Sequence, residues 1–157
     1  MPSFKGQYEH SVDSKGRVAF PAKLRKALSP EANEGFTIIR GLEACLYLYP
    51  NDEWEKVENK LYKVNSFKKR ERTVIRNILR HAEDLTLDKQ NRISLPGTLA
   101  EFSNIGSSVV FIGMGKYIEI WNPKNLDKQD EQLTDEESQE LTEEVLSDVF
   151  DTMEGDL

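Results

Sequence analysis

The segment DSKGR at residues 13–17 combines residue types that could bind nucleic acid through a tight turn. Gly16 permits the left-handed backbone that such a turn needs, and Asp13 can accept hydrogen bonds from its amide groups. Lys15 and Arg17 would then lie on a rigid, protruding edge. Arginine suits bidentate contact with guanine, and lysine suits guanine or phosphate. The alternative is that Arg17 only forms an ion pair with Asp13 inside the turn.

The pattern of this turn occurs a second time in the chain. Residues 88–102 read DKQNRISLPGTLAEF, and four identities keep an offset of 75 (88 − 13): Asp13/Asp88, Arg17/Arg92, Pro21/Pro96 and Leu24/Leu99. We therefore expect two copies of one unit, with chance similarity between two β-hairpins as the alternative. Arg92 is a further candidate DNA contact. Because the helix that follows it has lost every basic residue, we expect Arg92 to contribute less than Arg17.

Further basic residues follow the turn of the first copy. Pro21 is expected to open a short helix at residues 22–28, and its three basic residues, Lys23, Arg25 and Lys26, are expected to face solvent. A second basic cluster lies in KKRERTVIRNILR at residues 68–80. We interpret this cluster as a solvated helix face, with phosphate contacts or pairing with the acidic tail as alternatives.

The net charge of −7 conceals a strong asymmetry along the chain. Residues 123–157 hold two lysines and thirteen acidic residues, which give a charge of −11. Residues 1–122 therefore hold nineteen basic and fifteen acidic residues, which give a charge of +4. A basic body with an acidic tail is compatible with nucleic-acid binding despite the negative total.

No constellation of residues in the sequence points to catalysis. GxSxG, HExxH, P-loop and GxGxxG motifs are absent, so we expect no enzyme, no cofactor and no small-molecule substrate. The single cysteine, Cys45, excludes an intrachain disulfide and is interpreted as a core residue, because neither His10 nor His81 lies near it in sequence. So few histidine and cysteine residues also make a metal site unconvincing. Without a long apolar run or a signal segment, we expect no membrane association and a cytoplasmic location.

The hydrophobic pattern predicts the same order of elements in both copies. The first copy is expected to contain strand-turn-strand at 8–21, a helix at 22–28, strands at 35–41 and 45–49, and helices at 51–64 and 66–80, with Asn51 and Ser66 as N-caps. The second is expected to contain strand-turn-strand at 83–96, a helix at 96–102, strands at 109–115 and 116–121, and a helical stretch from Asn122. Because one four-stranded unit cannot bury both faces, the copies should share one core about a pseudo-two-fold axis.

Apolar side chains indicate which faces of the two longer helices are buried. The side chains expected to face inward are Trp54, Val57 and Leu61 in the first, and Val74, Ile75, Ile78 and Leu79 in the second. The first copy is also three residues longer than the second between its turn motif and the end of its last strand. We place these extra residues in the loop SPEANEG at residues 29–35.

The acidic tail carries the pattern of an amphipathic helix. Thr134 and Glu137 have the spacing of a capping box. Apolar residues follow at helical spacing: Leu141, Val145, Leu146, Val149, Phe150 and Met153. We expect either a solvated acidic helix that packs back on the body, a disordered segment, or a helix that docks on a partner. Its charge could also compete with DNA for basic side chains.

Four stretches of the chain resemble the MraZ family of bacterial regulators of the division and cell-wall gene cluster. They read FKGQYEHSVDSKGRVAFPAKLRKAL, RGLEACLYLYPNDEWEKVENKL, LDKQNRISLP and IEIWN, and the resemblance covers about residues 4–125. It implies an α+β fold, mainly β, in which two swapped-hairpin AbrB-like units form one pseudo-dimeric barrel with flanking helices. The expected domains are a first repeat with its following helix at 4–64, a basic connecting helix at 65–81, a second repeat at 82–125 and the acidic tail, helical or disordered, at 126–157.

The resemblance also implies a function and a set of DNA contacts. It implies a nucleoid-associated transcriptional regulator that binds short tandem repeats in the promoter of that gene cluster, including its own gene, as a closed homo-oligomeric ring. The first turn would supply the main contacts through Lys15 and Arg17, and Lys5 falls where the family commonly has an arginine. Arg25 and Lys26 match basic positions of AbrB-type relatives. Asn91 departs from the usual glycine of the second motif, although asparagine also tolerates a positive φ.

The alternative function is an AbrB-like protein-interaction module of antitoxin type that does not read an operator. The basic first loop and helix favour DNA, because a pure protein binder would not need them.

Overall fold

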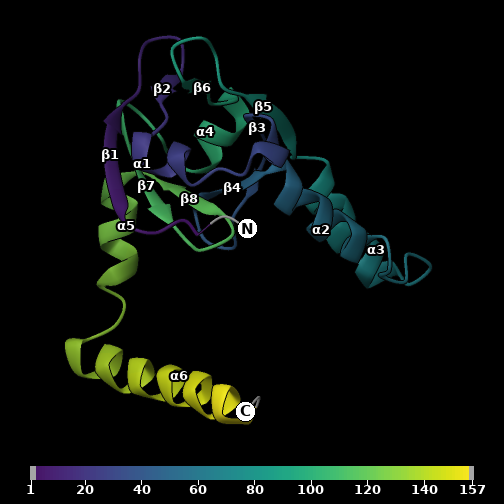
Figure 1. Ribbon diagram of the computed structural model, residues 1–157, viewed down its shortest axis with the longest axis vertical. Helices are drawn as coiled ribbons and strands as arrows, with labels where there is room; N and C mark the ends of the chain where they lie inside the picture. Colours follow the sequence, from purple (N-terminus) through teal and green to yellow (C-terminus); the bar gives the residue numbers. More distant parts are fainter. Residues whose placement is uncertain (1–2, 156–157) are drawn as a thin grey trace. The chain divides into compact units, whose positions relative to one another are not determined.

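The computed structural model describes residues 3–155, which divide into two compact units, one ending at Asn125 and the other beginning at Leu126 (Figure 1). In the first repeat the elements are β1 (Gln7–Ser11), β2 (Arg17–Ala19), α1 (Ala22–Lys26), the 3-10 helix η1 (Pro30–Ala32), β3 (Gly35–Arg40), β4 (Leu46–Pro50) and α2 (Asn51–Leu61). After α3 (Lys69–Leu79) the second repeat contains β5 (Glu83–Thr86), β6 (Arg92–Ser94), α4 (Gly97–Phe102), β7 (Ser108–Gly113) and β8 (Ile118–Trp121). The chain continues with α5 (Pro123–Asp130) and α6 (Asp135–Gly155).

The two repeats exchange their first strands. Six antiparallel strands form one sheet in the order β1-β7-β8-β4-β3-β5, and β2 pairs with β6 in a separate two-stranded ribbon. This order reads the same backwards when each strand is replaced by its counterpart in the other repeat, β1 by β5, β3 by β7 and β4 by β8. Thus β1 lies against β7 of the second repeat and β5 lies against β3 of the first. The arrangement has the pseudo-two-fold symmetry that the repeated motif predicts.

One buried core contains side chains from both repeats. Alternate residues of the central strands point into it, such as Leu46 and Leu48 of β4 and Ile118 and Ile120 of β8, all fully buried. The shared core is the reason why neither repeat can be a separate small domain. Within residues 3–155, no helix is both long enough and apolar enough to cross a membrane.

The expectation of a closed barrel is wrong, because the edge strands β1 and β5 of the six-stranded sheet do not pair with each other. The turn after β1 takes the chain out of the sheet, and Val12, the residue after β1, forms an isolated bridge with Val18 of β2. The strand β2 pairs with β6, and Val18 lies opposite Ile93. The edge strands β1 and β5 are therefore linked through the ribbon β2–β6 and not by hydrogen bonds to each other.

The extra residues of the first repeat occupy two places. Glu9 of β1 and Asp84 of β5 are equivalent positions at the offset of 75. Glu9 pairs with Val110 and Asp84 pairs with Thr37, so equivalent residues of β3 and β7 are 73 positions apart (110 − 37) rather than 75. The strands β4 and β8 are offset by 72 (118 − 46). Two of the three residues thus lie before β3, within the predicted loop and the residues beside it, and the third lies between β3 and β4.

The helical hairpin α2–α3 departs most from the predicted structure. Trp54 is buried as expected, but α2 begins after Pro50 without a side-chain cap from Asn51. The helix α3 begins after Lys68, not after Ser66, and has no buried residue; Val74 is 57% exposed. In Figure 1 the two helices run side by side away from the sheet, so the apolar face of α3 does not reach the core. The prediction that this face points inward is wrong.

Gly113 lies where the backbone of Phe4 and Lys5 approaches the end of β7, and this contact can be tested. A Cβ atom at this position would overlap the backbone of Lys5, next to the bridge between Phe4 and Gly115. We expect Gly113→Ala to lower the free energy of unfolding by about 1–3 kcal/mol through overpacking. Gly97→Ala is the matched control, because no atom lies within 4 Å of its added Cβ. Equal urea midpoints for the two variants would contradict this account of the β1–β7 edge.

Candidate nucleic-acid interface

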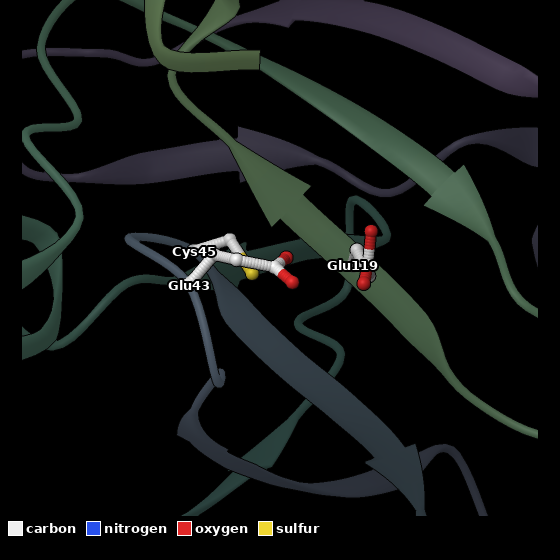
Figure 2. Close-up of side chains that lie close together, drawn as sticks. All are labelled: Glu43, Cys45 and Glu119. Carbon is white, nitrogen blue, oxygen red and sulfur yellow. The ribbon is translucent and has the colours of Figure 1, made fainter. Parts of the chain in front are cut away.

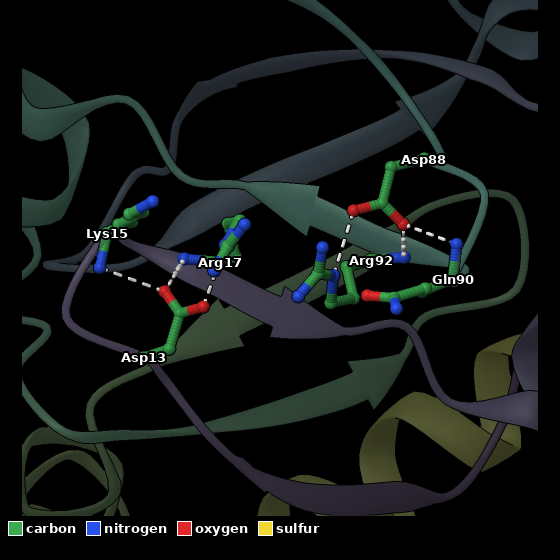
Figure 3. A network of polar contacts seen from close by, with 6 residues as sticks. All are labelled: Asp13, Lys15, Arg17, Asp88, Gln90 and Arg92. Carbon is green, nitrogen blue, oxygen red and sulfur yellow. Dashed lines mark hydrogen bonds and ion pairs between the residues drawn. The ribbon is translucent and has the colours of Figure 1, made fainter.

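The carboxylate of Asp13 organises the first turn motif (Figure 3). Its Oδ1 accepts hydrogen bonds from the backbone N–H groups of Lys15 (2.9 Å) and Arg17 (2.8 Å), and its Oδ2 accepts from Nε of Arg17 (2.7 Å). The backbone N–H of Gly16 donates to the carbonyl of Asp13 at 3.0 Å, and Gly16 has a φ of 77°. This is a three-residue hairpin loop with a glycine bulge. The predicted tight turn is confirmed.

The second turn copies the first atom by atom. Asp88 accepts from the backbone N–H groups of Gln90 (2.8 Å) and Arg92 (2.9 Å) and from Nε of Arg92 (2.8 Å). Asn91 takes the place of the glycine with a φ of 58° and donates to the carbonyl of Asp88 at 3.0 Å. The expectation that asparagine tolerates this backbone is confirmed. The aspartate and arginine of the motif therefore stabilise the turn through hydrogen bonds, in addition to placing charged groups on it.

The ion pair with Asp13 leaves most of the Arg17 guanidinium available. Only Nε donates to the carboxylate, and within residues 3–155 neither Nη atom makes a hydrogen bond. The Arg17 side chain is 33% exposed. The carboxylate thus fixes the plane of the guanidinium while its outer two nitrogens keep their donors. Pairing inside the turn and contact with a ligand are compatible.

Both arginines lie on one outward face of the ribbon β2–β6. Val18 and Ile93 face each other at its centre and are buried, and side chains alternate along a strand. Arg17 pairs with Ser94 and Arg92 pairs with Ala19, so the arginines sit diagonally on the opposite side from the core. One surface therefore carries two carboxylate-held guanidinium groups, and we call it the ribbon face.

Each turn is held against the other repeat. The backbone N–H of Phe20 donates to the carbonyl of Asn91, and that of Leu95 donates to the carbonyl of Gly16, both at 2.9 Å. Two residues after Phe20 the basic helix α1 begins, so α1 starts beside the second turn rather than beside its own. The basic helix that begins closest in sequence to this contact with the second turn is therefore α1, which belongs to the other repeat.

The remaining predicted contacts are distributed unevenly around this face. Lys15 on the first turn and Lys23 and Lys26 on α1 are exposed, whereas Arg25 is half-buried and its buried Nε has no partner within residues 3–155. Lys5 lies at the opposite end of β1 from the turn, beside the β7–β8 connection. The structure therefore joins the two turns and begins α1 two residues after one of these contacts, and it does not bring Lys5 to them.

Lys89 is an exposed basic residue of the second turn that sequence reasoning missed. It is exposed on the second turn, between Asp88 and Gln90. The offset of 75 aligns it with Ser14, so a comparison of equivalent positions shows no basic residue in the first copy. The signal that could have found it is the turn itself, since every residue between Asp88 and Arg92 lies at its tip.

A separate cluster contains the candidate metal ligands of the described residues (Figure 2). Ligand atoms of Glu43, Cys45 and Glu119 lie within 4.8 Å of one another, so these residues could hold a divalent cation. Burial, followed by the carboxylates of Glu119 and Glu43, raises the pKa of the Cys45 thiol to about 12, so the thiol is neutral near pH 7. Cys45 is fully buried, as predicted for a core residue. The cluster shares no strand with the two turns.

The turn carboxylates make a prediction about acid stability. The backbone N–H of Arg17 is the largest cause that lowers the pKa of Asp13 below its ordinary 3.8, and that of Arg92 acts likewise on Asp88. A carboxyl whose pKa is lower in the folded state stabilises the fold above its unfolded pKa and loses that contribution as pH falls. We therefore expect urea midpoints of the wild-type chain to fall below about pH 4, and those of Asp13→Asn/Asp88→Asn to fall less.

A control for this measurement is Glu136→Gln on α6, which removes a charge outside the turns. In Glu136→Gln the urea midpoint should fall at low pH as it does in the wild type. Coincident acid limbs for the wild type and the double variant would show that the turn carboxylates are not the groups responsible.

Comparison with known proteins gives a family and several relatives. Residues 3–77 and 78–149 each match the family described as "MraZ protein, putative antitoxin-like". A protein of Halothermothrix orenii named "Transcriptional regulator MraZ" is 41% identical over 121 residues, 77% of this chain and 82% of the relative. Proteins of the same name are 40% identical in Caldanaerobacter subterraneus, over 89% of this chain and 94% of the relative, and 37% identical in Natranaerobius thermophilus, over 91% and 96%.

Proposed function

This chain belongs to the MraZ family, and from that premise we propose that it is a transcriptional regulator that binds a specific promoter sequence through the ribbon face. The observation that carries the proposal is the pair of guanidinium groups, each held by an aspartate through Nε and with no hydrogen bond from its Nη atoms to residues 3–155. Two arginines fixed on one antiparallel ribbon are suited to reading base edges, because a two-stranded ribbon fits the major groove.

The cations around the ribbon face divide into two roles. Arg17 and Arg92 are pre-oriented by their ion pairs, so we assign base contacts to them. Lys23 and Lys26 on α1 are exposed and unrestrained, so we assign phosphate contacts to these lysines. Arg25 is half-buried and less suited to either role. Lys5 would reach DNA only in another orientation or from another copy.

The family supports a more specific proposal about the target. We propose that the target is the promoter of the division and cell-wall gene cluster, including the gene of this protein, with short tandem repeats as the operator. The protein would then act in the cytoplasm at the nucleoid, as a homo-oligomeric ring in which several ribbon faces meet successive repeats. A single ribbon face is small, whereas specific interfaces bury on the order of 1,000 Å² of protein surface or more.

A second candidate function rests on the description of the matched family, which includes the words antitoxin-like. In that case the same fold would bind a protein partner and would not read an operator. A gel shift of the protein on its own upstream promoter region, with a scrambled sequence as control, distinguishes the two. A shift of both fragments to the same extent would favour the protein-binding alternative.

We expect Arg17→Ala to weaken binding to the promoter by about 1–3 kcal/mol more than binding to random DNA, because bidentate base contacts discriminate by that amount. Since α1 begins beside the second turn, Arg92→Ala should have a comparable effect. Lys23→Ala is the matched control: it should weaken both complexes alike and reduce the salt dependence. Competition titrations measure this, with circular dichroism to verify folding. An unchanged preference in Arg17→Ala would refute base reading.

The ring makes a separate prediction about operator length. Linked ribbon faces raise the effective concentration of each further contact. We therefore expect the protein to elute as a multimer and its affinity to rise steeply from one to three tandem repeats, as fluorescence anisotropy would record. A monomer by light scattering that binds one repeat as tightly as three would exclude the ring.

A further inference from the structure

The helix α6 has an apolar stripe that no other described residue of its own unit, 126–155, covers. None of its 21 residues is buried. The exposed fractions of the stripe are 46% for Leu141, 59% for Val145, 46% for Leu146, 47% for Val149, 56% for Phe150 and 59% for Met153. Nine acidic residues and no basic residue occupy the rest of the helix. An amphipathic helix of this kind is typical of a segment that packs on another surface.

The hairpin α2–α3 offers a surface of opposite charge. Its two helices enclose an open groove of about 210 Å³, lined by Leu61, Val64, Arg70, Glu71, Val74 and Ile75. Further apolar side chains of the hairpin are exposed: Phe67, in the connection between the two helices, at 94% and Leu79, at the end of α3, at 39%. Residues 60–80 hold eight basic residues and one acidic residue, Glu71. An apolar groove in a basic hairpin is thus the complement of an apolar stripe on an acidic helix.

The two surfaces also agree in length. The stripe from Leu141 to Met153 spans about 18 Å at 1.5 Å per residue, and α3 spans about 17 Å. Because the surfaces differ from each other and every chain carries both, they can join copies head to tail. A heterologous interface of this type generates a ring when the rotation between copies closes.

We propose that α6 of one copy packs into the α2–α3 groove of a neighbouring copy and forms the subunit contact of the assembly. The inference rests on the proposed function for the existence of a multimer, and it names the surfaces that build it. The apolar stripe would fill the groove, and acidic residues beside it would meet basic side chains of the hairpin. The exposed apolar side chains of both elements are then buried in the assembly.

Disulfide trapping between chains tests the contact. One preparation carries Val149→Cys on α6 and another carries Val74→Cys in the groove, and the two are mixed and mildly oxidised. The native Cys45 is fully buried and does not compete. We expect a cross-linked pair to form at least tenfold faster than with the control Leu42→Cys, which is 92% exposed in the β3–β4 connection. A rate equal to that of the control overturns the proposal.

A chain that carries both cysteines distinguishes the occupant. If dilution leaves only an intramolecular disulfide and no product between chains, α6 packs on its own chain and the proposal is wrong. If the product between chains persists on dilution to the working concentration of the assembly, the neighbouring copy is the occupant.

Light scattering without DNA separates this inference from the proposed function. Val145→Ser/Val149→Ser should lower the particle mass, whereas Glu140→Ser/Glu144→Ser, on the acidic side of the same helix, should lower it less. A wild-type multimer whose mass is unchanged by the first variant overturns the inference and leaves the DNA proposal standing. A multimer that contains the trapped contact but does not shift its promoter would support the inference and refute the DNA proposal. A wild-type monomer overturns the inference.

Discussion

Each repeat depends on the hydrogen bonds that its first strand makes with the other repeat. The pairing of β1 with β7 and of β5 with β3 completes one six-stranded sheet and one core. It also determines where the functional groups lie, since the strands that leave the exchanged edges, β2 and β6, can pair only with each other. The ribbon face exists because of this exchange: Val18 and Ile93 anchor its inner side, and Arg17 and Arg92 are thereby directed outward.

Hydrogen bonds within each turn orient the arginines that the strand exchange places on the ribbon face. An aspartate that accepts two backbone N–H groups and one guanidinium N–H is a strong, charge-assisted arrangement on an otherwise exposed turn. It restricts the arginine before any ligand arrives, so less conformational entropy is lost on binding. The acidic helix α6 carries no such preorganised group, and its charges suit a broad complementary surface better than a specific contact.

Residues whose roles are set by nearby sequence were predictable, and residues whose roles depend on distant partners were not. The turn around Asp13, its copy at Asp88 and the tolerance of Asn91 for a positive φ follow from local hydrogen bonds. The surroundings of Arg92 and the isolation of Lys5 depend on which strand pairs with which, and periodicity does not contain that information. The apolar face of α3 illustrates the same limit: its helical spacing is real, but spacing alone does not say whether the surface that covers it belongs to the core.

The strand exchange has a consequence for the order in which the protein can fold during synthesis. Gln7–Ser11 leaves the ribosome well before its partner Ser108–Gly113, which is translated about a hundred residues later. Until then β1 has no partner strand. The edge of β3 that later pairs with β5 is also unpaired until β5 has been translated. Because non-local pairing is slow and exposed edges aggregate, the nascent first repeat is the vulnerable stage, and the native sheet becomes attainable only when the second repeat is nearly complete.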